Sequence, residues 1–242
     1  MRLIFLWGIF FLMPSLSMAS PSFEEGRGVY KLRFMWVVPI GEAHISFKSQ
    51  DFNKEKAYKI SASYDSPSWA SLFFKLKGEV ASFVDSETHL PMRYEETYSY
   101  TGHPHQYHVL SYDQKNGKVS IDRNGEKEDK SIPLPTLDPL SALYFLKQKE
   151  WSKGVVARYN LNSHQSNYEL ELECVHEEKI KFNHKLLDTW VLKGTLKRSD
   201  LLHLPPKAEF TTWISQDHKR LPLKMKLKTK IGFLSLTLDP HF

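Results

Sequence analysis

The chain has 242 residues, of which 41% are hydrophobic and 25% charged, and its formal net charge is +5. This composition excludes a disordered chain and a multi-span membrane protein, and it favours a soluble globular protein. The single cysteine, Cys174, excludes an internal disulfide framework and a zinc site made of several thiolates. We expect Cys174 to be a small buried side chain on a strand.

The first residues predict an export signal. Arg2 provides a positive charge, residues 3–13 form an apolar run, and residues 17–19 (Ser-Met-Ala) fit a cleavage site. The run is shorter than the roughly 20 residues that span a bilayer. We therefore expect a signal peptide over 1–19 and a single β-rich domain over 20–242. The mature protein should be periplasmic and without a transmembrane span. It should not be a lipoprotein, because the residue directly after the cleavage site is Ser20 and not a cysteine.

Between residues 30 and 238, apolar and polar residues mostly alternate with a period of two, which is typical of half-buried antiparallel strands. The alternation predicts fourteen strands, over 30–36, 43–47, 58–64, 79–84, 92–100, 105–113, 118–122, 155–161, 168–176, 178–182, 190–198, 208–214, 223–231 and 233–238. Turns are expected at 39–41 (Pro-Ile-Gly) and at two Asn-Gly pairs, 116–117 and 124–125. The predicted fold class is all-β and mainly antiparallel, as a single curved sheet or an open β-barrel.

Two segments depart from this alternation and predict short helices. Residues 66–75 place Trp69, Leu72 and Phe73 at helical spacing. Residues 138–147 form the better candidate, because Asp138 can cap the first amides and Pro139 suits the first helical position. We expect both helices to plug an end of the sheet or to cover one of its faces.

An internal repeat suggests that the sheet is continuous. Residues 83–94 and 213–225 both contain an aromatic-bearing strand, an acidic turn, and a Leu-Pro pair that opens the next strand. Proline fits the start of a strand because it lacks an amide donor. Duplication and convergent hairpin chemistry both remain open as explanations.

Residues 30–43, 90–96, 112–118, 138–144 and 213–223 together resemble the exported bacterial family called domain of unknown function 3108. The resemblance spans nearly the whole mature chain and implies a periplasmic or envelope-associated protein of Gram-negative bacteria. Its motifs are structural, so it implies no catalytic site. The hairpins alone also resemble the curved sheets of Lol-type lipoprotein carriers, which close around a lipid-sized cavity.

Aromatic residues make up 13% of the chain and can fill a core or line an acyl-chain cavity. The sequence leaves open whether the interior is filled or hollow. If it is hollow, we expect an apolar ligand-binding concavity lined by Phe34, Trp36, Trp69, Phe73, Tyr144 and Trp213.

A second candidate surface is basic. The residues Lys224, Lys226, Lys228 and Lys230 alternate with apolar ones, which places four ammonium groups on one face of a strand. This face either is only solvated or contacts anionic lipid headgroups or acidic glycans. Nucleic acid is not an expected partner, because the protein is exported and shows no aromatic–basic platform.

Catalytic motifs of the hydrolase, metalloprotease and nucleotide-binding classes are absent from the sequence. His103 and His105, with Glu95 and Glu96 across the expected hairpin, form either a solvated turn or a weak metal bridge. We assign no catalytic residue, no metal ligand and no cofactor. A hydrolase would need a nucleophile, a histidine and a carboxylate that converge in a cleft.

The sequence therefore favours a non-enzymatic, periplasmic binding or carrier-like protein that engages a lipidic or amphipathic envelope molecule. The alternative is a structural or interaction protein of cell-envelope assembly. In that case an envelope protein partner would dock on a sheet edge or on the lysine face.

Overall fold

The structure is a computed structural model that describes residues 25–67, 76–100, 105–164 and 166–241. The predicted signal peptide over 1–19 lies outside the described residues. So does most of the first predicted helix, including Trp69 and Phe73.

The described residues form fifteen strands and one α-helix. The strands are β1 (Gly26–Phe34), β2 (Val38–Ser49), β3 (Ala57–Asp65), β4 (Leu76–Asp85), β5 (Pro91–Tyr100), β6 (Gln106–Asp113), β7 (Lys118–Arg123), β8 (Glu126–Ser131), β9 (Thr136–Leu137), β10 (Val156–Ser163), β11 (Ser166–Phe182), β12 (Lys185–Arg198), β13 (Ala208–Ser215), β14 (Pro222–Thr229) and β15 (Gly232–Leu238). The helix α1 spans Pro139–Gln148 and follows β9.

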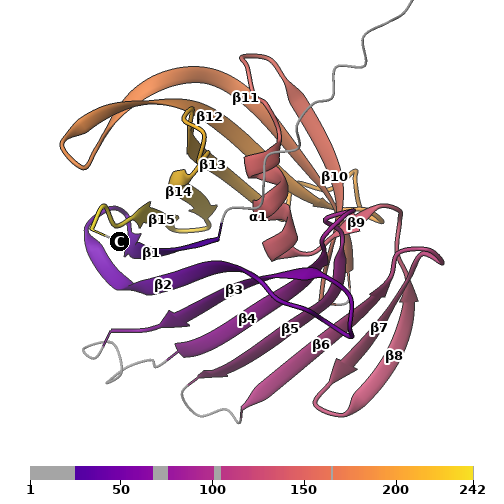
Figure 1. The fold of residues 1–242 in the computed structure, drawn as a ribbon. Helices are drawn as coiled ribbons and strands as arrows, with labels where there is room; N and C mark the ends of the chain where they lie inside the picture. Colours follow the sequence, from indigo (N-terminus) through magenta and orange to yellow (C-terminus); the bar gives the residue numbers. More distant parts are fainter. Residues whose placement is uncertain (1–24, 68–75, 101–104, 165, 242) are drawn as a thin grey trace, which may run out of the picture.

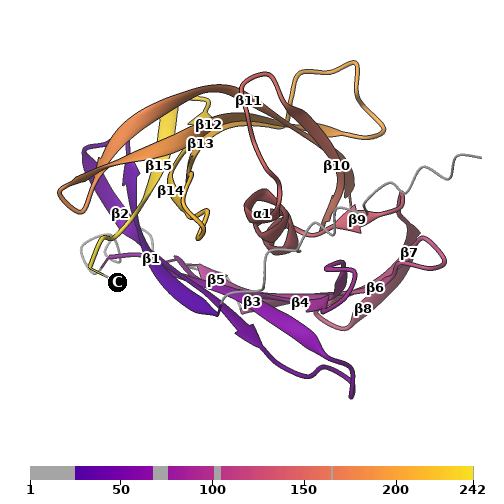
Figure 2. The same cartoon turned by 45° about the horizontal axis from the view of Figure 1, so that its top comes forward.

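All the strands belong to one sheet in the order β8-β7-β6-β5-β4-β3-β2-β1-β15-β14-β13-β12-β11-β10-β9. Neighbouring strands are antiparallel except β9 and β10. Since β1 pairs with both β2 and β15, the first and last strands meet in the middle of the sheet, and β8 and β9 are its edges. Figures 1 and 2 show the sheet curling around α1. The predicted fold class, all-β and mainly antiparallel with a single curved sheet or open β-barrel, is therefore confirmed.

Several element boundaries differ from the prediction. Strand β11 is continuous over a segment predicted as two strands, because a bulge between Cys174 and His176 shifts the alternation. Strand β8 (EKEDKS) was not predicted, since its sequence has no apolar residue. The first turn lies at residues 35–37 and not at 39–41, and both Met35 and Trp36 adopt a positive φ there.

Helix α1 begins where the sequence predicts. The fully buried Asp138 carboxylate accepts hydrogen bonds from the amides of Leu140 and Ser141, each at 2.8 Å. It also accepts one from Ser82 Oγ of β4 at 2.5 Å. These bonds satisfy the free amides of the first turn and tie the helix to the sheet.

Two hydrophobic clusters occupy the barrel interior on either side of α1. Cluster A consists of Leu137, Ala142, Leu146, Trp151, Ala157, Leu161, Leu170, Leu172, Cys174, Leu192 and Ile214. Cluster B consists of Ile60, Val84, Tyr94, Leu110, Val119, Ile121, Ile132, Leu140 and Tyr144. Leu143 and Phe145 of the helix pack against both clusters. Helix α1 therefore lies between the two clusters and packs against both halves of the sheet.

The repeated hairpins of the sequence are β4–β5 and β13–β14, and each contains a bulge near the end of its first strand. Their turns place His89 and Arg220 at positive φ, directly before the Leu-Pro pairs. Both residues contact the helix. The His89 ring lies 5.1 Å from the Tyr144 ring, and Arg220 Nη1 donates to the Gln148 carbonyl at 3.0 Å. The repeat therefore holds α1 at two positions.

Side-chain hydrogen bonds join strands near the two edges of the sheet. Asn167 Nδ2 of β11 donates to the carbonyl of Ser131 in β8 at 3.0 Å. Tyr112 of β6 donates from its hydroxyl to Asn162 Oδ1 of β10 at 3.4 Å. These bonds close the barrel where backbone pairing ends. Among the described residues, no helix is long and apolar enough to cross a membrane.

Candidate functional site

Three connections lie at the same end of neighbouring strands, because these strands alternate in direction. They are the β1–β2 turn, the β14–β15 turn and the β12–β13 loop. The Met35 amide donates to the Phe233 carbonyl at 3.0 Å, so the first two turns are in contact. The β12–β13 loop is next along the same end, since β13 pairs with β14.

These connections carry seven exposed large apolar side chains, which we call the apolar rim. They are Met35, Trp36, Val37, Val38, Leu202, Leu204 and Ile231. Val37 and Ile231, at the tips of two adjacent turns, are 78% and 81% exposed. Large exposed apolar side chains on neighbouring turns are typical of an interaction surface.

The backbone of the first turn supports a role other than stability. Met35 and Trp36 have φ values of 50° and 67°, a left-handed conformation that disfavours residues other than glycine or asparagine. Such positions cost on the order of 1 kcal/mol each and cluster at functional sites. Met35 and Trp36 thus combine a strained backbone with exposed apolar side chains, and neither feature stabilises the fold.

Beside the rim, on the outer face of the sheet, lies an aromatic–lysine cluster formed by Trp36, Trp213, Phe233, Lys224 and Lys226. Lys224 Nζ lies 4.0 Å from the ring centroid of Trp36 and 4.7 Å from that of Trp213. Lys226 Nζ lies 4.2 Å above the Phe233 ring. Cation–π contacts of this kind hold each ammonium group over an aromatic face.

The environment of Lys224 lowers its proton affinity. Burial lowers the pKa of Lys224, and the nearby Glu178 carboxylate partly offsets this effect. The same carboxylate accepts a hydrogen bond from Trp213 Nε1. Lys224 thus contacts two aromatic rings and lies near one carboxylate.

Three of the four lysines of the predicted basic face lie on strand β14, and the fourth lies in the turn that follows it. Lys224, Lys226 and Lys228 share the outer face of β14, and Lys228 Nζ pairs with Glu209 at 2.6 Å. Lys230 lies in the turn beside Ile231 and is exposed. The lysines therefore lead along β14 to the apolar rim.

Of the residues predicted for an apolar concavity, Trp69 and Phe73 lie outside the described part of the chain, and the other four do not gather in one place. Tyr144 lies on α1 within cluster B, whereas Trp36 and Trp213 flank Lys224 on the outer face. Trp213 points outward because its neighbour Ile214 belongs to the interior cluster A. Phe34 faces inward at the end of β1, opposite Leu234.

The other rim residues were not predicted as site residues. The available signal was the run Met35-Trp36-Val37-Val38, four apolar residues beside a proline. Runs of this length at an exposed turn oppose folding unless they serve a function.

The interior cavity is small. It has a volume of about 170 Å³ between α1 and strands β1, β2 and β14, and its lining includes Tyr30, Phe47, Leu143 and Leu238. Ligand pockets usually measure about 300–1,000 Å³. This cavity is therefore smaller than a usual lipid-sized site, and helix α1 packs against both clusters beside it.

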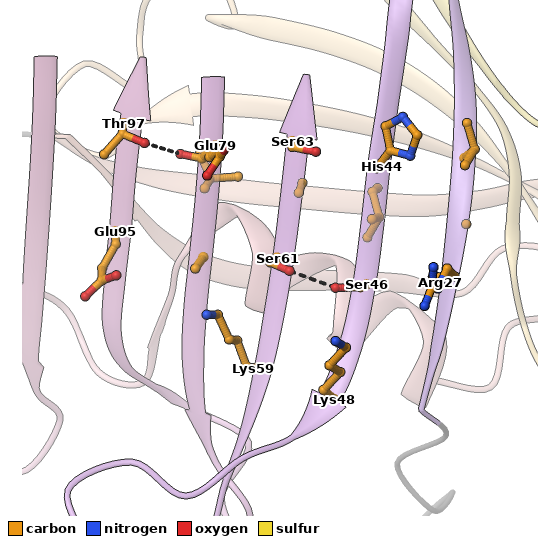
Figure 3. Close-up of a pocket in the computed structure, with 16 residues that line it drawn as sticks. Arg27, His44, Ser46, Lys48, Lys59, Ser61, Ser63, Glu79, Glu95 and Thr97 are labelled. Carbon is orange, nitrogen blue, oxygen red and sulfur yellow. Dashed lines mark hydrogen bonds between the residues drawn. The ribbon is translucent and has the colours of Figure 1, made fainter. Parts of the chain in front are cut away.

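A larger groove of about 640 Å³ crosses the outer face of β1 to β5 (Figure 3). Ser46 and Ser61 form its floor and hydrogen-bond to each other through their hydroxyls at 2.8 Å. Lys48 and Lys59 lie toward one end and Glu79 toward the other. Among the described residues, no hydrogen bond joins either hydroxyl to a histidine or a carboxylate that could act as a general base.

Comparisons with known proteins agree with the fold. A family model described as "Protein of unknown function (DUF3108)" matches residues 29–239. A crystal structure of a beta-barrel-like protein of domain of unknown function DUF1849 from Brucella abortus is similar, with a TM-score of 0.60 and 10% sequence identity. The match covers 90% of this chain and 96% of that one, and at this identity it shows the fold alone. No curated protein matches the sequence.

Proposed function

The chain belongs to the DUF3108 family of proteins of unknown function, and we propose that it is a non-enzymatic binding protein of the cell envelope. In this proposal the apolar rim and the adjacent lysines engage anionic lipid at a membrane surface. The observation that carries the proposal is the placement of seven exposed apolar side chains on neighbouring turns beside Lys224, Lys226, Lys228 and Lys230.

The energies of such a contact suit reversible binding. Burying an aliphatic side chain such as that of Val37 or Ile231 contributes about 1.5–3 kcal/mol. Each lysine near an anionic surface contributes about 1 kcal/mol. Trp36 suits the headgroup region, where indole rings concentrate. Apolar insertion and basic attraction together provide the two signals that stable membrane attachment requires.

The interior offers less support for a carrier that encloses its lipid. Its cavity of about 170 Å³ is below the usual range for ligands. Helix α1 is fixed at its start by Ser82 and near its end by Arg220, so it is not built as a lid. The proposal therefore assigns the amphipathic ligand to the barrel end and not to the barrel interior.

The alternative function, docking of an envelope protein on a sheet edge, has weaker support. Edge strand β8 has the sequence EKEDKS, and charged residues at an edge oppose strand addition. Lys127, which lies on this edge, has a side chain that is 78% exposed. The apolar rim, in contrast, presents exposed apolar side chains and not charged ones.

Vesicle binding tests the proposal. The purified protein should sediment with vesicles that contain phosphatidylglycerol and much less with pure phosphatidylcholine. The double variant Val37→Asp/Ile231→Asp should weaken binding at least about tenfold, because each inserted side chain contributes more than 1.4 kcal/mol. Both positions are highly exposed, so folding should be unaffected.

Leu186→Asp is the matched control. Leu186 is 67% exposed and lies at the start of β12, at the end of that strand away from the β12–β13 loop. Its substitution should leave vesicle binding unchanged. Equal loss in both variants, or equal binding to neutral and anionic vesicles, would contradict the proposal.

We also propose that residues 1–19 are removed on export to the periplasm, as the predicted signal peptide implies. Mass spectrometry of the protein recovered from a periplasmic fraction should then give a chain that starts at Ser20. Recovery of the uncleaved chain from the cytoplasm would contradict this part of the proposal.

A further inference from the structure

A cluster of one carboxylate and two imidazoles lies apart from the rim residues. Glu96 of β5 is the register partner of His108 in β6, and His164 belongs to the turn between β10 and β11. Glu96 Oε2 lies 3.3 Å from His164 Nδ1 and 3.8 Å from His108 Nδ1. The three ligand atoms all lie within 4.8 Å of one another.

The carboxylate of this cluster has one buried oxygen without a hydrogen-bond donor among the described residues. That oxygen is Glu96 Oε2. A buried carboxylate without hydrogen bonds is costly, and it is stabilised by a cation within reach.

We propose that Glu96, His108 and His164 bind a divalent transition-metal ion, with Zn²⁺ as the best fit. Zinc bonds of about 2.0–2.1 Å in a tetrahedron place ligand atoms roughly 3.3 Å apart. The Glu96–His164 separation already matches this value, and the Glu96–His108 separation exceeds it by less than 1 Å.

The donor set also selects the class of ion. Imidazole nitrogen suits zinc and other late first-row metals, whereas calcium and magnesium prefer sites made only of oxygen. Three protein ligands leave one tetrahedral position for water or an outside ligand. The His164 side chain is 54% exposed, so an ion can enter from solvent.

Ring contacts fix the position of His108. The centroid of its ring lies 5.7 Å from that of Tyr98 and 5.3 Å from that of His164, and both contacts are edge-on.

The proposed ion joins parts of the sheet that are distant in the strand order. Strands β5 and β6 belong to the first half of the sheet, and the β10–β11 turn belongs to the second half. The ion therefore crosses the gap that the Asn167–Ser131 hydrogen bond also bridges. Its expected role is to hold the open barrel closed.

Calorimetric titration of the untagged, chelator-treated protein with ZnCl₂ tests the site. We expect binding of one Zn²⁺ per chain. His164→Asn and Glu96→Gln should each weaken it by more than the roughly 10–100-fold that loss of an outer-shell partner causes. Asparagine tolerates the positive φ of 52° at position 164, so the variant should fold.

His176→Ala is the matched control, because His176 Nε2 also lies near a carboxylate, 3.5 Å from Glu178 Oε2, but on the surface with no second imidazole in the pair. It should bind Zn²⁺ as the wild type does. A Co²⁺ adduct should show the visible absorption of a tetrahedral site, and His164→Asn should abolish it. Failure of stoichiometric binding, or equal binding by wild type and His164→Asn, would mean that the cluster is only an ion pair.

Discussion

Asp138→Ala should lower the free energy of unfolding by at least about 3 kcal/mol. The substitution removes a helix cap, which contributes about 0.5–2 kcal/mol, and leaves buried donors unpaired at about 1–3 kcal/mol each. Those donors are the amides of Leu140 and Ser141 and the hydroxyl of Ser82. Urea unfolding followed by circular dichroism measures the effect.

Asp113→Ala is the control for this substitution. Asp113 also accepts backbone hydrogen bonds, from Lys115 and Asn116, but it does so in an exposed turn. Its loss should change stability far less than the loss of Asp138. Equal effects of the two substitutions would mean that Asp138 does not anchor the helix inside the barrel.

The charge of Asp138 should make stability depend on pH in a defined direction. Burial raises the pKa of this carboxyl from 3.8 to about 6, although the hydrogen bonds from Ser82 and the helix amides oppose the rise. The unfolded chain therefore loses this proton before the folded chain does. Stability from this group is fully present below pH 4 and is lost as the pH rises to about 6, by roughly 3 kcal/mol at 1.36 kcal/mol per pKa unit.

Asp138→Asn isolates that contribution, because asparagine keeps a capping oxygen without an ionisable proton. The difference in unfolding free energy between wild type and this variant should change between pH 4 and pH 6, in favour of the variant at the higher pH. A constant difference over this interval would show that the carboxyl has an ordinary pKa.

Features of the fold that depend on local chemistry were predicted from the sequence. The start of α1 follows from Asp138 and Pro139, and the alternation of most strands gave the correct class of sheet. Strand β8 was missed because pairing at a charged edge leaves no hydrophobic pattern. The turn at 35–37 was missed because Trp36 continues the apolar alternation of β1 although its backbone has already reversed.

The candidate sites depend on long-range register, which a single sequence does not specify. The alternation of Lys224 with apolar residues predicts a basic face, but its contact with Trp36 requires β1 to pair with β15 and β15 with β14. Glu96 and His108 lie close in sequence on one hairpin. His164 joins them only because the sheet curls and brings its two halves together.

Leu110→Ala and Leu172→Ala should each lower the free energy of unfolding by about 2–5 kcal/mol, the usual cost of deleting a fully buried leucine side chain. Both residues are 0% exposed, Leu110 in cluster B and Leu172 in cluster A. Leu186→Ala, at a position that is 67% exposed, should have almost no effect. Chemical unfolding of the three variants under one set of conditions provides the comparison.

The two core substitutions also decide between a filled and a hollow barrel. Leu143 and Phe145 of α1 pack against both clusters, so a cavity made on either side borders the same helix. In a filled barrel both variants lose stability by a similar amount, and a long-chain fatty acid leaves the wild type unchanged. A hollow, lipid-carrying barrel would instead tolerate both deletions and gain stability from the fatty acid, since a ligand that binds only the folded state raises its stability.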